Sequence, residues 1–164
     1  MTRFNEFWLA TAEPSFESFV TNGVDCCRLV IDASRDANHC AIRLQRSQDG
    51  ADAYVLAPFY QHGTDGGADC STYKTQLDAT HWAGLHSLLD VCRFWQMPID
   101  NNRYGLDGVT YTFDVYLDGR QHRVVPWSPD PVASRGELFC VVTDYLERLA
   151  MLAAYDCKLH KRYG

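Results

Sequence analysis

Six histidines and seven cysteines are the residues of this 164-residue chain best suited to proton transfer, metal binding or nucleophilic attack. His81 and His86 are five positions apart, so on one helix they would point in different directions, and the chain has no His-Glu-x-x-His or Cys-x-x-Cys spacing. Ser128 lies in no Gly-x-Ser-x-Gly turn. The spacing therefore predicts no metal site, no cofactor and no assembled catalytic group.

His122 keeps one catalytic alternative open. It precedes Arg123 on an expected return strand, where it could face Asp107 or Asp114 and exchange a proton with that carboxylate. Polar pairs across a hairpin are more often structural. A small cytoplasmic enzyme using this pair is therefore an alternative, as is a regulatory or oligomeric adaptor protein.

The hairpin that would carry His122 is the best-specified element of the sequence. Its first strand alternates apolar and polar residues, which predicts one core-facing and one solvent-facing side. Asp118-Gly119 supplies a tight turn, and Pro126 ends the return strand. The alternating apolar positions are Val109, Tyr111, Phe113, Val115 and Leu117, and the return strand is Gln121 to Val125.

The other elements follow from apolar spacing and from residues that begin or end helices and turns. Four further strands are expected at Val24–Ile31, Cys40–Gln45, Tyr54–Tyr60 and Cys70–Leu77. A short helix is expected between Pro14 and Asn22, a core-facing helix from Asp78 or Thr80 to Cys92, and a long helix after Ser134 with an apolar stripe at Leu138, Val141, Val142, Tyr145, Leu146, Leu149 and Leu152.

Together these elements predict one α+β domain spanning residues 1–164, with an antiparallel sheet, built from a meander and a hairpin, covered by two main helices. The hydrophobic share of 46% is that of a packed globular protein. A net charge of -6 argues against nucleic-acid binding. Neither a signal peptide nor a long apolar run is present, so we expect a cytoplasmic protein with reduced cysteines and no membrane segment.

A series of features between residues 82 and 149 resembles small bacterial immunity proteins of contact-dependent and other polymorphic toxin systems. The series comprises Trp82 and Leu85, Phe94-Trp95 with Pro98, Gly105-Leu106-Asp107-Gly108, the Tyr111 strand, Asp118-Gly119 with His122, Trp127-Ser128-Pro129 and the final apolar helix. Such proteins usually carry glutamate at the position of Asp114 and arginine at that of Pro126. The resemblance implies a protein that binds a cognate toxin domain and occludes its active site or an adjacent surface, without catalysis of its own.

A toxin-binding surface needs aromatic anchors and a polar rim on a stable scaffold. The residues expected to supply them lie on and around the hairpin: Asp100, Tyr104, Asp107, Asp114, Tyr116, Asp118 and Trp127. Tyr104 and Trp127 could instead cap the core, because large aromatic side chains are commonly buried. The toxin's activity, the stoichiometry and the oligomeric state are left open by the sequence.

Overall fold

The computed structural model describes residues 13–33, 40–47, 50–59, 69–99, 108–127 and 141–149. Three of the residues expected to bind a partner, Asp100, Tyr104 and Asp107, lie outside these ranges, as do both ends of the expected C-terminal helix.

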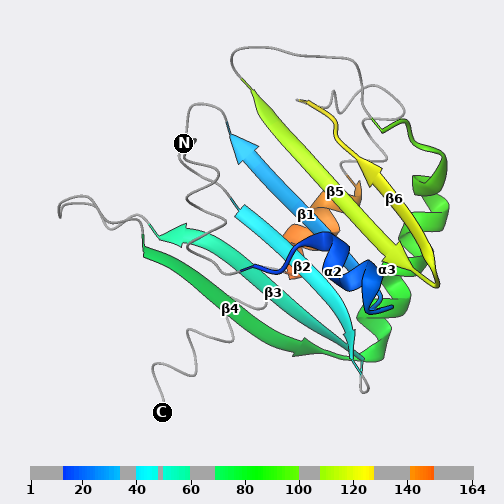
Figure 1. Cartoon of the computed structure of the whole chain (residues 1–164), viewed down its shortest axis with the longest axis horizontal. Coiled ribbons are helices and arrows are strands. Elements are labelled where there is room, and N and C mark those ends of the chain that lie inside the picture. The colour runs from blue at the N-terminus through cyan, green and yellow to red at the C-terminus, as the bar shows by residue number, and fades with distance from the viewer. Residues whose placement is uncertain are drawn as a thin grey trace.

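One antiparallel sheet of six strands organises the described residues (Figure 1). Strands β1 to β4 form the expected meander, and the β5–β6 hairpin pairs with the free edge of β1, giving the order β4-β3-β2-β1-β5-β6. The prediction of an α+β fold built on a meander and a hairpin is therefore confirmed. The strand bounds are β1 Cys26–Ala33, β2 Cys40–Ser47, β3 Gly50–Phe59, β4 Asp69–Leu77, β5 Val109–Leu117 and β6 Arg120–Val124.

The main core lies on the sheet face that is covered by helix α3 (Ala79–Val91), the 3-10 helix η1 (Phe94–Gln96) and a helix over 141–149. Asp78 is the N-cap of α3, because its carboxylate accepts hydrogen bonds from the backbone N–H groups of Thr80 and His81. The core combines apolar side chains of both helices with those of the central strands: Leu85, Leu89, Phe94, Phe113, Val115, Val142 and Leu146 are all fully buried.

The 141–149 helix faces the core through a slightly different arc from the expected one. Val142, Leu146 and Leu149 are buried, whereas Val141 is 44% exposed and Thr143 is buried. Positions 142, 146 and 149 lie on one side of a 3.6-residue helix, and position 141 lies at its margin. The expectation that Val141 faces the core is therefore wrong.

A tight contact joins α3 to the 141–149 helix. Tyr145 donates a hydrogen bond from its hydroxyl to the carbonyl of His81 over 2.9 Å. A Cβ atom at Gly84 would lie 2.9 Å from that hydroxyl oxygen, which is closer than carbon and oxygen pack. Glycine at position 84 therefore makes room for the tyrosine.

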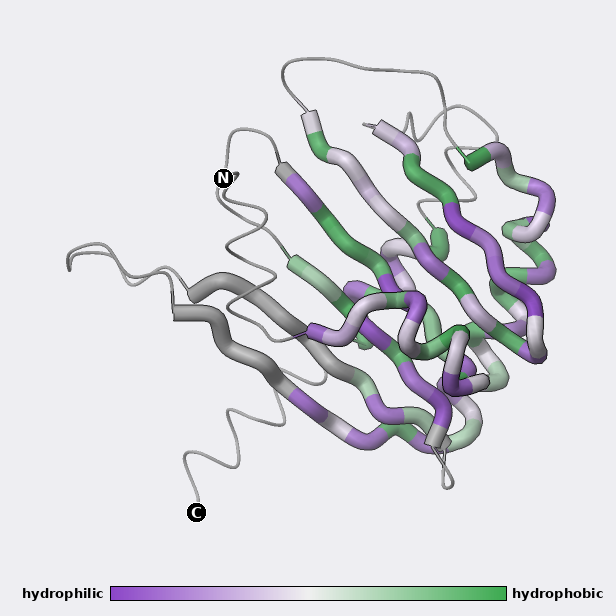
Figure 2. Tube along the Cα trace, viewed as in Figure 1, coloured by the Kyte–Doolittle hydropathy of each residue, from purple (hydrophilic) through white to green (hydrophobic). Residues whose placement is uncertain are grey.

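The opposite sheet face differs from the sequence prediction. Alternate residues of β5 were expected to face solvent, yet Asp114 is 1% exposed, and Arg28 of β1 and Arg43 of β2 are also buried. Helix α2 (Phe16–Thr21) covers this face (Figure 1). Figure 2 shows hydrophilic residues between the hydrophobic ones along β1 and β2.

We expect Gly84→Ala to act differently in two backgrounds. In a Tyr145→Phe variant, which lacks the hydroxyl, the substitution should raise the free energy of unfolding by about 1 kcal/mol through helix propensity. In the wild-type background the gain should vanish or become a loss, because the methyl group displaces Tyr145. Chemical denaturation of the four proteins measures this coupling, and equal effects in both backgrounds would contradict the contact.

Candidate functional site

Three arginines and one aspartate lie side by side in a row across the face that α2 covers. Their order follows from strand register, since Arg43 of β2 pairs with Arg28 of β1, Arg28 with Asp114 of β5, and Asp114 with Arg123 of β6. Directly opposite residues of neighbouring strands point to the same face, so all four side chains meet there.

Asp114 is the centre of this row. Its Oδ2 atom accepts a hydrogen bond from Nη2 of Arg28 over 3.1 Å, and its Oδ1 atom accepts one from Nε of Arg123. The Asp114 side chain is 1% exposed and that of Arg28 is 10% exposed, whereas that of Arg123 is 44% exposed. The hydrogen bond to Asp114 raises the pKa of Arg123 above its ordinary value. The triad of Arg28, Asp114 and Arg123 is thus buried at one end and open at the other.

The segment before α2 also pairs with the buried arginines. Nη1 of Arg28 donates to the carbonyl of Pro14 over 3.1 Å, and Nε of Arg43 donates to Oε1 of Glu13 over 2.8 Å. The Glu13 side chain is 2% exposed, so its carboxylate is a buried counter-ion supplied from outside the sheet.

Two phenylalanines of α2 cover the same arginines. The Phe16 ring lies 5.2 Å from the guanidinium carbon of Arg28, and the Phe19 ring lies 5.0 Å from that of Arg43. Guanidinium groups are favourably placed over aromatic faces. Charge pairing and aromatic packing therefore hold residues 13–21 against the sheet together.

Cys26 lies beneath α2 and is fully buried with Phe16 and Phe19. Burial raises the pKa of its thiol to about 12, against the opposing effect of the nearby Arg43 and Arg28. A thiol with this pKa is protonated at neutral pH and is a poor nucleophile. Cys26, Cys27, Cys40 and Cys92 all carry free thiols.

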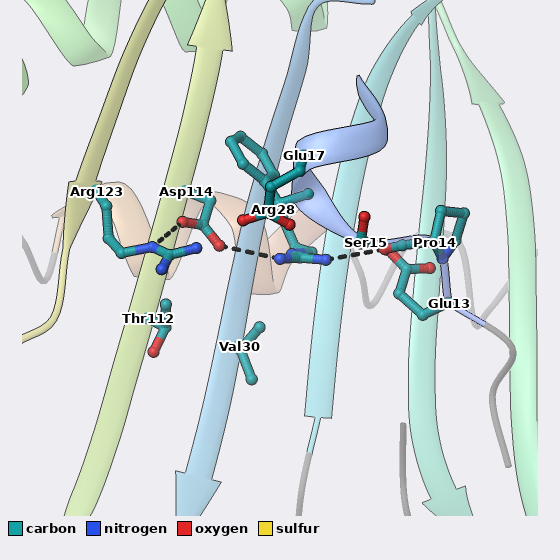
Figure 3. A pocket seen from close by; sticks show the side chains of 10 residues that line it. Glu13, Pro14, Ser15, Glu17, Arg28, Val30, Thr112, Asp114 and Arg123 are labelled. Carbon is teal, nitrogen blue, oxygen red and sulfur yellow. Dashed lines mark hydrogen bonds and ion pairs between the residues drawn. The ribbon is translucent and has the colours of Figure 1, made fainter. Parts of the chain in front are cut away.

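An open cleft of about 410 Å³ lies beside α2 over this row (Figure 3). Figure 3 shows Val30 of β1 and Thr112 of β5 on one side of the charged row and Glu17 on the other, with Glu13, Pro14 and Ser15 at the Arg28 end of the row. The cleft is also lined by three residues of the charged row, Arg28, Asp114 and Arg123. The cleft therefore combines apolar surface with charged groups, which make up five of its ten lining residues.

The described residues that were predicted to bind a partner differ in their exposure. Asp118 is exposed in the β5–β6 turn, Tyr116 is half-buried against the Phe16 and Phe19 cluster, and Trp127 is half-buried with its backbone bridged to Thr110. Asp114 is buried between two arginines and so cannot be the surface contact that the sequence suggested.

The proposed pairing of His122 with Asp114 is wrong, because the two side chains lie on opposite faces of the sheet. His122 pairs with Val115 across the hairpin, and its Nε2 atom lies 3.0 Å from the carbonyl oxygen of Met97. Its ring packs edge-on against Phe94. Asp107, the other suggested partner, lies outside the described residues.

Sequence reasoning missed Glu13, Arg28 and Arg43. The available signal was an arginine within each of two otherwise apolar strands, Cys26-Cys27-Arg28-Leu29-Val30 and Ala41-Ile42-Arg43-Leu44. A charge at such a position needs a buried partner or a covering element.

No family model matches the chain, and no curated protein sequence is significantly similar to it. Within the described ranges there is no group of three or more histidine, cysteine or acidic residues placed to hold a metal ion. No helix among the same residues is long and apolar enough to cross a bilayer.

Loss of the Glu13 carboxylate should loosen α2. We expect Glu13→Gln to remove the carboxylate that pairs with Nε of Arg43 and to increase the rate at which iodoacetamide alkylates Cys26, measured by peptide mass spectrometry. Glu17→Gln, which alters an exposed residue of α2, is the matched control and should leave the rate unchanged. Equal rates in wild type and Glu13→Gln would show that this ion pair does not hold the helix.

Proposed function

We propose that this protein binds and neutralises a cognate toxin domain, as bacterial immunity proteins do. Two observations from the sequence support the proposal: the ordered resemblance between residues 82 and 149, and the net charge of -6, which favours encounter with a basic partner. The interaction would be one of shape and charge, with no bond made or broken.

The rigid tip of the β5–β6 hairpin is the observation that supports this function best. Asp118 and Gly119 both have positive φ, the conformation of a tight two-residue turn. The backbone N–H of Asp118 donates to Oδ1 of Asp25 over 2.9 Å, and Oδ2 of Asp25 is paired with Arg46. A tip that is already ordered loses little conformational entropy when it binds.

The tip also presents suitable groups. The Asp118 side chain is exposed, and Tyr116, two residues before it, is half-buried against the aromatic cluster beneath α2. Protein interfaces commonly combine aromatic anchor residues with a rim of exposed polar groups. Tyr116 could serve as such an anchor, and Asp118 could belong to such a rim. We therefore place the toxin contact at this tip.

Charge reversal at the tip tests the proposal. The partner to be tested is the product of the neighbouring upstream gene, and Asp118→Arg should weaken its binding by about tenfold or more, because like charges would face each other across the interface. Asp144→Arg, on the exposed side of the 141–149 helix, is the matched control and should bind as wild type does. Biolayer interferometry with the purified proteins measures both.

Co-expression decides the broader claim. Wild-type protein should protect cells from the toxin domain and co-purify with it. Failure of both would overturn the proposed function, whereas binding that Asp118→Arg leaves intact would overturn the placement at the tip.

A further inference from the structure

Strand β6 is the outer strand at one edge of the sheet, so alternate backbone groups of this strand face away from β5 (Figure 1). Leu117 and Arg120 flank the two-residue turn and form the first pair across the hairpin. Such a flanking pair exchanges both hydrogen bonds, and along an antiparallel ladder these pairs alternate with pairs that exchange none. The N–H and C=O groups of Gln121, Arg123 and Val125 therefore point outward from the sheet.

The chain itself pairs with this edge at Val125, whose N–H donates a hydrogen bond to the carbonyl of Ile99. The backbone groups of Gln121 and Arg123 form no hydrogen bond with any described residue, and both residues are exposed. Outward-facing N–H and C=O groups on an edge strand are a template for pairing with another chain. The edge is thus open from the hairpin turn to the point where Ile99 covers it.

The side chains beside the open edge indicate what kind of strand would fit. The guanidinium carbon of Arg120 lies 4.3 Å from the centre of the Trp95 ring, and no described carboxylate forms an ion pair with this arginine. Ile99, at the far end of the open edge, is 63% exposed. Side chains directly opposite each other on neighbouring strands interact, and opposite charges there are favourable. An added strand would gain most from a carboxylate beside Arg120 and apolar residues near Ile99.

A second copy of this chain fits the edge less well. The sequence of β6 is Arg-Gln-His-Arg-Val, which contains no acidic residue. Two β6 strands placed side by side would therefore offer no carboxylate to Arg120 of either copy. Charged side chains on an edge strand are a common protection against pairing between identical chains. The edge thus favours a different chain that carries negative charge.

We propose that the edge of β6 binds an extended, acidic segment of a partner protein, which pairs with the backbone of Gln121 and Arg123 and places a carboxylate beside Arg120. In this mode of recognition, main-chain hydrogen bonds supply affinity and alternate side chains supply selectivity. The inference does not depend on toxin binding, because a synthetic peptide tests it at a site other than the hairpin tip.

The probe is the peptide acetyl-Thr-Val-Glu-Val-Glu-Val-Thr-amide, and the same peptide with lysine at both glutamate positions is its cationic counterpart. In the free ¹⁵N-labelled protein, the amide hydrogens of Gln121 and Arg123 should exchange rapidly, whereas that of His122, which faces β5, should be protected. The acidic peptide should give saturable shifts of the Gln121 and Arg123 amide signals and slow their exchange. Protection of these two amides in the free protein, absence of saturable shifts, or equal or tighter binding of the lysine peptide would overturn the proposal.

A pair of variants at position 121 tests the backbone contact. Gln121→Pro removes one outward N–H group, and Gln121→Thr, its matched control, keeps that group. Proline is compatible with an edge strand where the missing N–H would face solvent. The acidic peptide should bind Gln121→Pro about fivefold or more weakly than Gln121→Thr, because a backbone hydrogen bond is lost. Equal affinities for these two variants would contradict strand pairing.

A second pair of variants tests the charge preference. Arg120→Gln should weaken binding of the acidic peptide by about twofold to fivefold, the range expected when an exposed ion pair is lost. Arg148→Gln, which removes an exposed arginine from the 141–149 helix, is the matched control and should bind as wild type does. Equal affinities for Arg120→Gln and Arg148→Gln would show that Arg120 does not select the partner's carboxylate.

Discussion

Burial of the Asp114 carboxylate between Arg28 and Arg123 is the constraint on which the arrangement of this protein depends. A carboxylate with 1% exposure is tolerated only where cations and hydrogen bonds replace water. The three residues come from β1, β5 and β6, so their pairing fixes how the hairpin docks on the meander. A shift of one residue in register would turn Asp114 toward the apolar core.

The same constraint explains why the sheet is covered on both faces. Arg28 and Arg43 bring two positive charges into the sheet face opposite α3, and the single negative charge of Asp114 does not balance both of them. Glu13 supplies a second carboxylate, and Phe16 and Phe19 supply aromatic surface over the guanidinium groups. Residues 13–21 thus form a second layer that is held by charge as much as by apolar contact. The cleft lies beside this layer, where Arg123 reaches solvent.

Local features of the sequence were sufficient to predict much of the fold. Asp118-Gly119 specified the hairpin, and apolar alternation located β2 and β5 within a few residues. Of the two caps expected for α3, Asp78 and Thr80, Asp78 is the one that begins the helix. Each of these features depends on neighbours within about ten residues. The first strand was placed two residues early, because Val24 belongs to the turn after α2, where its N–H donates to the carbonyl of Phe19.

The candidate site could not be predicted in the same way. Arg28 and Asp114 are 86 positions apart, and Glu13 and Arg43 are 30 apart, so no local pattern pairs them. Alternation along β5 also placed Asp114 on a polar face, and a polar face is normally solvated. Only the strand order, which brings β5 beside β1, and the position of α2 show that this face is covered.

The free energy of unfolding of two variants tests the central role of this ion-pair triad most directly. Asp114→Asn removes the buried carboxylate that pairs with both Arg28 and Arg123 and should cost about 3 to 5 kcal/mol. Replacing all three residues together, as Arg28→Met, Asp114→Leu and Arg123→Met, removes the buried charges and should cost much less. A cost for Asp114→Asn below about 0.5 kcal/mol, the range of ordinary surface substitutions, would contradict the account.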